Sequence, residues 1–136
     1  VPVDGSEHSV RALEKAMSMF SEEAGIKLHV ITVQAPIVSG NVTRYFSAED
    51  IKAFYEEEGR KALAPVKHLI ERAGGTCTEK VLVGPIAATI AEYAKEHACD
   101  QIIMGTRGLG RVSGLVLGSI ATKVISLSSV PVTLVK

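Results

Sequence analysis

The sequence has 136 residues, of which 46% are hydrophobic and 22% are charged. This length suits one domain, which we assign to residues 1–136. The formal net charge is zero, with 15 basic and 15 acidic residues, and this balance argues against a nucleic-acid-binding protein that relies on a basic face. Because no apolar run reaches transmembrane length, we expect a soluble globular protein with no membrane partner.

The two cysteines, Cys77 and Cys99, lie far apart and lack the spacing of metal ligands. Reduced thiols in a cytoplasmic protein are the ordinary interpretation of such a pair. The chain has no recognisable signal peptide and does not begin with Met. We therefore expect a cytoplasmic protein, and we expect a few leading residues to be missing from this sequence.

In chain order, the first two strands are predicted from short apolar stretches. Residues 1–4 are predicted to be the end of a first strand, and the turn at residues 4–6 to lead into a helix that ends at Gly25. Residues 28–33 predict a second strand. Its nearly continuous apolar character is typical of a parallel sheet that is covered on both faces.

The connection over residues 34–47 is long for a compact α/β domain. Such segments are usually lids, partner sites or disordered, and the sequence leaves the three open. The next helix is predicted from its cap at Ser47 towards Ala73. We expect a kink or break near Lys61, because Pro65 lacks the N–H that would bond to the Lys61 carbonyl.

Three further strands are predicted, over residues 76–83, 101–104 and 130–135. Helices that begin at Pro85 and Ile120 separate them. The alternation of strands and helices predicts an α/β fold with a parallel, doubly wound sheet. In such sheets ligands bind beyond the carboxyl ends of the strands, where the strand order reverses.

A glycine-rich stretch, residues 105–119, joins the fourth predicted strand to the last predicted helix. Glycines let the backbone approach a ligand closely, and unpaired N–H groups at a helix start attract an anion. Residues 101–136 contain four basic residues and no acid, which leaves the first hundred residues with a formal charge of −4. This asymmetry favours an anion near the loop; a mobile surface loop without a ligand is the alternative.

The pattern Gly105-x2-Gly108-x9-Gly118-Ser119, with Asp4 also in place, resembles the ATP-binding signature of the universal stress protein family. The resemblance covers essentially the whole chain. It implies a flavodoxin-like or Rossmann-like sheet of five parallel strands in the order 3-2-1-4-5, with helices on both faces. That order puts strands 1 and 4 side by side, so that Asp4 and the glycine loop would open onto one crevice.

The resemblance implies an ATP site made of the glycine loop and the neighbouring strand ends. The residues predicted for it are Pro2, Val3, Asp4, Val30, Met104, Gly105, Arg107, Gly108, Gly118, Ser119, Ile120 and Ala121. The three glycines of the signature are expected to hold backbone against the triphosphate, because a Cβ would push the anion away and a positive φ would penalise other residues. Ser119 and the next two N–H groups are expected to donate to phosphate oxygens, unless Ser119 is only a helix cap.

By the same resemblance, Pro2, Val3 and Asp4 line the adenosine pocket, with Asp4 near the ribose or the base. Val30 and Met104 are expected to contact adenine from neighbouring strand ends. These assignments give the nucleoside and the phosphates separate parts of one crevice.

Arg107 is a side-chain candidate for the phosphates, since a charged hydrogen bond contributes about 1.5–3 kcal/mol. Arg111 is either a second such group or simply solvated. Ala121 stands where the family often has a hydroxyl residue, so we expect one phosphate hydrogen bond to be lost. The spacing fits neither a Walker loop, which needs Lys before its Ser/Thr, nor a dinucleotide fingerprint, which belongs after the first strand.

Efficient ATP hydrolysis needs a group that orients water and a dedicated metal ligand. The loop and the last helix contain neither an acid nor a histidine. We therefore expect a nucleotide-dependent regulator that hydrolyses ATP slowly if at all, with Mg²⁺ arriving on the triphosphate. One alternative is an interaction module that does not bind ATP productively, or that prefers AMP or a cyclic nucleotide. Another is a metabolic enzyme on the same scaffold, which the lack of an acid–base pair disfavours.

The last predicted strand, residues 130–135, would leave an apolar edge exposed, and such an edge usually finds a partner. The family resemblance implies that this strand pairs with its own copy, antiparallel, across a twofold homodimer. A monomer with a covered edge is the alternative. An unidentified regulatory protein is expected as a further partner.

Overall fold

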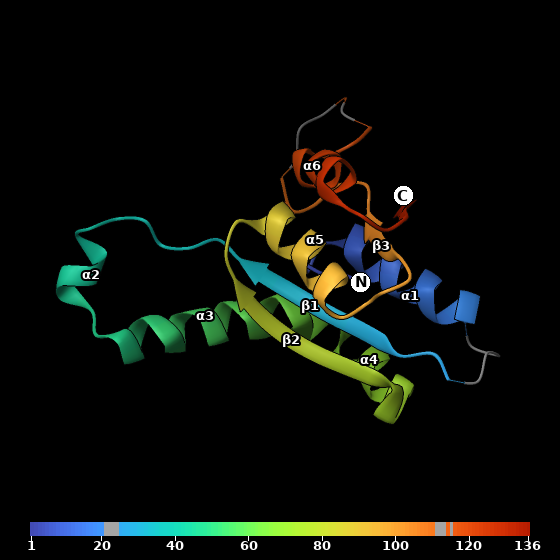
Figure 1. The fold of residues 1–136 in the computed structure, drawn as a ribbon. Coiled ribbons are helices and arrows are strands. Elements are labelled where there is room, and N and C mark those ends of the chain that lie inside the picture. Colours follow the sequence, from blue (N-terminus) through green and yellow to red (C-terminus); the bar gives the residue numbers. More distant parts are fainter. Residues whose placement is uncertain (21–24, 111–113, 115) are drawn as a thin grey trace.

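The structure is a computed structural model of residues 1–136, and it describes all of them except 21–24, 111–113 and 115. Helices lie on two sides of the strands (Figure 1). The elements in chain order are α1 (Glu7–Phe20), β1 (Leu28–Gln34), α2 (Val42–Tyr45), α3 (Ala48–Leu63), η1 (Ala64–Val66), α4 (Lys67–Ala73), η2 (Gly74–Thr76), β2 (Cys77–Val83), α5 (Ile86–Glu96), β3 (Ile102–Gly105), α6 (Ser119–Leu127) and β4 (Val132–Val135).

The strands form two parallel pairs. β1 pairs with β2 along the seven residues of each strand, and β3 pairs with β4 along four. The described hydrogen bonds therefore give two two-stranded sheets, whereas the sequence predicted one sheet of five strands. Four of the five predicted strands are present, each within two residues of its predicted bounds.

The predicted first strand is reduced to a single parallel bridge between Pro2 and Ile31. Val3 N–H donates to the Ile31 carbonyl at 2.8 Å, and Ile31 N–H donates to the Val1 carbonyl at 3.1 Å. The backbone groups of Val1 and Val3 thus face β1, which leaves Pro2 facing the other edge. Because proline has no N–H to donate there, a regular ladder on that edge is interrupted.

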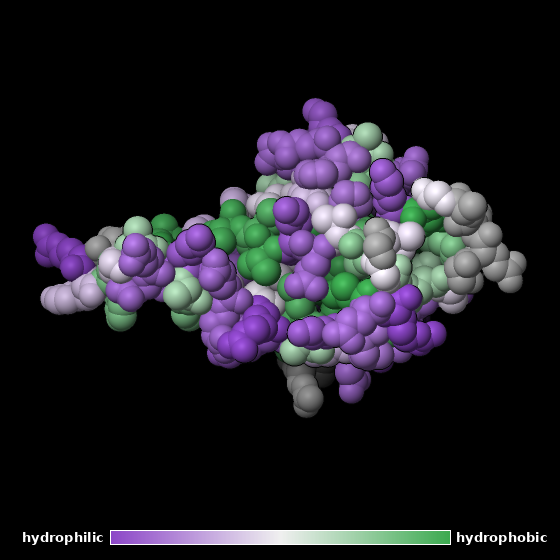
Figure 2. Space-filling view, turned by 90° about the horizontal axis from the view of Figure 1, so that it is seen from below, coloured by the Kyte–Doolittle hydropathy of each residue, from purple (hydrophilic) through white to green (hydrophobic). Residues whose placement is uncertain are grey.

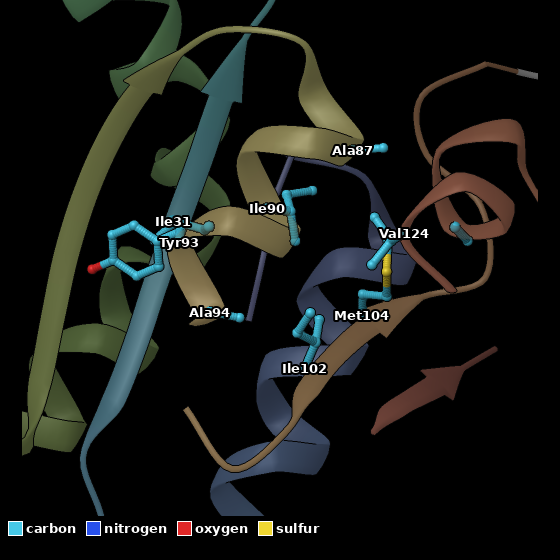
Figure 3. Packing of buried hydrophobic residues seen from close by; sticks show 9 residues of the cluster. Ile31, Ala87, Ile90, Tyr93, Ala94, Ile102, Met104 and Val124 are labelled. Carbon is cyan, nitrogen blue, oxygen red and sulfur yellow. The ribbon is translucent and has the colours of Figure 1, made fainter. Parts of the chain in front are cut away.

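The core lies on both faces of the strands, because successive strand residues point in opposite directions. Val30 is fully buried in a cluster with Leu13 of α1. Its neighbour Ile31 belongs to a second cluster with Ile90 of α5 and Val124 of α6 (Figure 3). The strands are thus covered by α1 and α3 on one side and by α5 and α6 on the other.

The long helical segment after residue 47 begins and breaks where the sequence places these events. The side chain of Ser47 accepts the N–H of Asp50 at 3.1 Å, and the Asp50 carboxylate accepts the N–H of Ser47 at 3.0 Å, which is a capping box. The predicted interruption by Pro65 is confirmed. It follows Leu63, and a 3-10 turn carries the chain from α3 into α4, so the break lies slightly beyond Lys61.

The connection over residues 35–47 projects from the body and contains the short helix α2, which the sequence did not predict (Figure 1). Ile37 N–H donates to the Tyr55 hydroxyl of α3 at 2.7 Å. Figure 2 shows hydrophilic and hydrophobic residues side by side on this projection. Its exposed apolar residues include Val38, Tyr45 and Phe46.

Among the described residues, no helix combines enough length with enough apolar character to span a membrane.

Candidate functional site

A cleft of about 370 Å³ lies beyond the carboxyl ends of β1 and β3. Its walls come from residues 2–4, the end of β1, the start of α5, the loop after β3 and the first turn of α6. All the residues predicted for the nucleotide site line this cleft except Val30. The structure therefore brings together segments that are more than a hundred positions apart in the sequence.

The prediction for Val30 is corrected by the structure. Its side chain is completely buried against Leu13 and Val66, on the face of the strand away from the cleft. β1 continues to Gln34, so the strand end lies beyond Val30, and Val33 lines the cleft instead. The signal in the sequence was that Val33 is the last apolar residue of the stretch.

The start of α5 supplies an apolar wall that the predicted site did not include. Ile86 and Ile90 both line the cleft, while Ile90 also belongs to the buried cluster with Met104. The turn at residues 84–85 that ends β2 could have indicated this wall, because it lies at another strand end. The other lining residues missed by the prediction are Ser9, Thr106, Leu109 and Gly110.

Asp4 stands between the first segment and the loop after β3. Its Oδ1 accepts the N–H of Ser6 at 2.9 Å, and its Oδ2 accepts the N–H of Leu109 at 3.2 Å. Gly5 has a φ of +85°, a conformation that favours glycine, and its turn leads into α1. The carboxylate is thus held at the cleft by two backbone N–H groups.

The three signature glycines are required by contacts within the chain. A Cβ on Gly105 would lie 2.7 Å from the His8 Cβ, and a Cβ on Gly118 would lie 3.3 Å from the Thr106 carbonyl oxygen. A Cβ on Gly108 would overlap the Asp4 carboxylate. None of the three has a positive φ. The expected positive-φ penalty is therefore wrong, and close packing is the observed reason for glycine at these positions.

The first turn of α6 points unpaired groups into the cleft. Gly118 is the N-cap residue, and its own N–H donates to the Thr106 carbonyl at 2.7 Å. The alternative that Ser119 caps the helix is therefore excluded. Ser119 is exposed, and its hydroxyl has no hydrogen-bond partner among the described residues. The first N–H groups of a helix lack intrahelical acceptors, so this turn offers donors to an anion.

The side chains of the next residues on α6 are already engaged. Ala121 is buried in the core cluster, so only its backbone faces the cleft. The hydroxyl of Thr122 donates to the Gly118 carbonyl at 3.0 Å. Thr122 therefore does not replace the hydroxyl that the family often has at the position of Ala121.

Few charges surround the cleft. Among the described residues, Asp4 and Arg107 are the titratable side chains that line it, and Arg107 is exposed without an ion pair there. Arg111 lies outside the described residues. Over the described residues, no group of three His, Cys, Asp or Glu side chains could hold a metal ion.

The cysteines do not belong to the cleft. Both are free thiols, and burial raises the pKa of Cys77 and of Cys99. Each packs at the margin of a core cluster. Protonated thiols in these positions have a packing role.

Comparison with known proteins identifies a family. The family model for the universal stress protein family matches residues 1–136. Universal stress protein MJ0531 of Methanocaldococcus jannaschii is 33% identical over all of this chain and 79% of the relative.

Solved structures agree with that match. The structure of protein MJ0577 of the same organism has a TM-score of 0.81 and 26% identity, over 99% of this chain and 92% of that one. A crystal structure of a universal stress protein in complex with cAMP has a TM-score of 0.66 and 25% identity, over 100% and 94% of the two chains. These likenesses support a flavodoxin-like α/β fold.

Proposed function

Since the chain belongs to the universal stress protein family, we propose that its cleft binds an adenine nucleotide, ATP above all, and that the protein is a nucleotide-dependent regulator in a stress response. One observation carries this proposal. The glycine loop, the first turn of α6 and residues 2–4 surround a single cleft large enough for a nucleotide.

The phosphates would lie at the first turn of α6. Ser119 offers a hydroxyl. Ile120 and Ala121 line the same wall, and their backbone N–H groups lie in the first turn of the helix, where they have no intrahelical acceptors. A helix N-terminus favours negative charge through these donors and through its dipole. The exposed guanidinium of Arg107 adds the positive charge that a triphosphate needs. Mg²⁺ would arrive with the triphosphate.

The nucleoside would lie at the apolar end of the cleft. Pro2, Met104 and Val33 present apolar surface there, and Ile86 adds to it from α5. Flat aromatic bases bind well against such surfaces, with a few polar groups fixing their orientation. Asp4 lines the same cleft, and its carboxylate would accept a hydrogen bond from a ribose hydroxyl.

We propose that hydrolysis of bound ATP is slow. A hydrolytic site needs a group that positions water, and Asp4 is the carboxylate that lines the described part of the cleft. In the proposed arrangement Asp4 lies beside the ribose and not beside the γ-phosphate. The site is therefore built for retention of the nucleotide more than for turnover.

A second candidate is preference for AMP or a cyclic nucleotide, or an interaction module that does not bind ATP productively. The solved relative in complex with cAMP favours this candidate. The two candidates differ in the role of the β- and γ-phosphates. If ATP is preferred, contacts of these phosphates with the first turn of α6 increase the affinity; if AMP or a cyclic nucleotide is preferred, they do not.

Isothermal titration calorimetry of the purified protein with ATP, AMP and cAMP, each with and without Mg²⁺, tests both candidates. We expect ATP to bind most tightly, and denaturing mass spectrometry to find ATP carried through purification. Tighter binding of AMP or cAMP would support the second candidate. No binding of any of the three at millimolar concentration would exclude nucleotide binding.

Sheet order and assembly are part of the same proposal. We place residues 1–4 between β1 and β3, which gives the order 3-2-1-4-5 of the predicted strands. β4 pairs with β3 on one edge, and the free edge would pair with its own copy in a twofold homodimer. Light scattering should then give twice the chain mass of 14.4 kDa, and a single-chain mass would contradict the dimer.

Only the family supports our proposal for the cellular role. We propose a cytoplasmic protein that acts through an unidentified regulatory protein partner. Binding of that partner should depend on the nucleotide, since we propose that the partner distinguishes the protein with a nucleotide in its cleft from the protein with an empty cleft.

A further inference from the structure

The Asp4 carboxylate connects two parts of the cleft that are far apart in the sequence. Its bond to Ser6 N–H belongs to the local turn before α1. Its bond to Leu109 N–H spans 105 positions and reaches the tip of the loop after β3. Asp4 follows Val3, whose N–H is bonded to β1 at 2.8 Å. The loop tip is therefore tied through Asp4 to the strands of the sheet.

Gly108 lies directly beside this bond. A Cβ built on Gly108 would overlap Asp4 Oδ2, and its next neighbour would be the Asp4 Cγ at 3.7 Å. Among the described residues, no other atom outside the adjacent residues lies within 4 Å of that position. Gly110, two residues later in the same loop, has no described atom within 4 Å of the place where its Cβ would lie. The carboxylate is thus the specific reason for glycine at position 108.

We propose that Asp4 is a positioning residue: its carboxylate clamps the glycine loop to the sheet, and Gly108 is glycine so that this clamp can close. The inference rests on the proposed nucleotide function and adds to it. A loop that is held in place before the ligand arrives loses less conformational entropy on binding. This role is separate from any contact between Asp4 and the ribose.

The geometry also predicts that the clamp can be opened without unfolding the protein. A methyl group on residue 108 would displace the end of a side chain, whereas the backbone around it has room. Asp4 can rotate away, at the expense of its bond to Leu109. Gly108→Ala is therefore a clamp variant, and Gly110→Ala is its matched control in the same loop.

The first test needs no nucleotide. Amide hydrogen exchange of Leu109 is measured by NMR in the wild type and in Gly108→Ala, Asp4→Ala and Gly110→Ala. We expect exchange to be roughly tenfold faster in the first two variants, the change that loss of one hydrogen bond to a charged group produces. Gly110→Ala should match the wild type. Equal exchange in the wild type and Asp4→Ala would overturn the clamp.

The second test is a double-mutant cycle on ATP affinity, measured by calorimetry. Gly108→Ala should weaken binding roughly tenfold in the wild-type background. In the Asp4→Ala background it should change binding by less than about twofold, because the new methyl group then meets no carboxylate. The cycle therefore measures the coupling between residue 108 and the Asp4 carboxylate, and the exchange experiment, which contains no nucleotide, separates the clamp from any contact between Asp4 and the ribose.

The remaining outcomes of the cycle decide against the clamp. An equal loss in both backgrounds would mean that Gly108 faces the ligand itself, and no loss in either would mean that the clamp does not matter for binding. If the wild type binds no nucleotide, the proposed function fails, while the exchange experiment still decides whether the clamp exists.

Discussion

The two connections that leave the carboxyl ends of β3 and β1 differ in how the rest of the chain holds them. After β3, the N–H of Thr106 donates to the Val135 carbonyl at 2.9 Å, and the N–H of Gly118 donates to the Thr106 carbonyl at 2.7 Å. The N–H of Leu109 donates to Asp4. Bonds to two distant parts of the chain, and one bond between the two ends of the loop, therefore fix the described part of this loop.

The connection after β1 is held differently. Ile37 N–H is bonded to the Tyr55 hydroxyl at 2.7 Å, and beyond it residues 38–46 project from the body (Figure 1). Val38 is 90% exposed and Tyr45 is 82% exposed. Both strand ends border the cleft, but a connection becomes part of its wall only when backbone hydrogen bonds and missing Cβ atoms let that connection fold back over the strand end. Length and apolar content alone do not achieve this.

The largest expected effect comes from adding a Cβ at Gly105, where the glycine loop after β3 begins. In Gly105→Ala the new methyl group would lie 2.7 Å from the His8 Cβ and 2.8 Å from the His8 backbone carbon. Since α1 must shift to make room, we expect the free energy of unfolding to fall by about 1–3 kcal/mol. Urea denaturation measures this change, with Gly110→Ala as the control. Equal stability of the two variants would show that the packing against α1 is loose.

The next effect is on binding and leaves the fold in place. In Gly118→Val the new side chain begins 3.3 Å from the Thr106 carbonyl oxygen and 3.4 Å from the Arg107 Cα. The loop must move away from α6, so we expect ATP affinity to fall at least about tenfold, with secondary structure and oligomeric state unchanged. Calorimetry, circular dichroism and light scattering check the three properties. Normal affinity would place the phosphates elsewhere.

The sequence predicted the site better than it predicted the reasons for its residues. The spacing of glycines after a buried strand indicated which loop would surround a cleft. Where another group packs closely against the backbone, a Cβ does not fit, so glycine is required whether that group belongs to a ligand or to the chain itself. What the spacing could not tell is which neighbour requires it: His8 for Gly105, Asp4 for Gly108 and Thr106 for Gly118. Those neighbours depend on tertiary packing, which has no local signature.

The misplacement of Val30 and the interrupted first strand have a similar origin. Alternation along β1 determines which face a residue occupies, but the exact strand end decides which residue reaches the cleft, and β1 runs to Gln34. The predicted first strand contains Pro2, which has no N–H to donate. In the structure it faces the edge away from β1, where its missing N–H interrupts the ladder.

A smaller effect is expected where the projecting connection meets α3. Hydrogen bonds from the Ser47 hydroxyl and backbone N–H lower the pKa of Asp50 below its ordinary value of 3.8. The ionised carboxylate therefore supports the helix start above that value, and its support is lost as the pH falls through the lowered pKa. We expect Ser47→Ala to raise the pKa of Asp50, measured by NMR titration. An unchanged pKa would mean that the capping box does not form in solution.

The smallest effect is expected on the projecting connection itself. Phe46 is 55% exposed, and the cleft residues do not include it. Phe46→Ser should therefore change the free energy of unfolding by less than about 0.5 kcal/mol and leave ATP affinity unchanged. The same denaturation and calorimetry measurements decide the point. A clear loss of ATP affinity would mean that this segment folds over the cleft as a lid when nucleotide is bound, and the contrast between the two connections would then hold only for the empty protein.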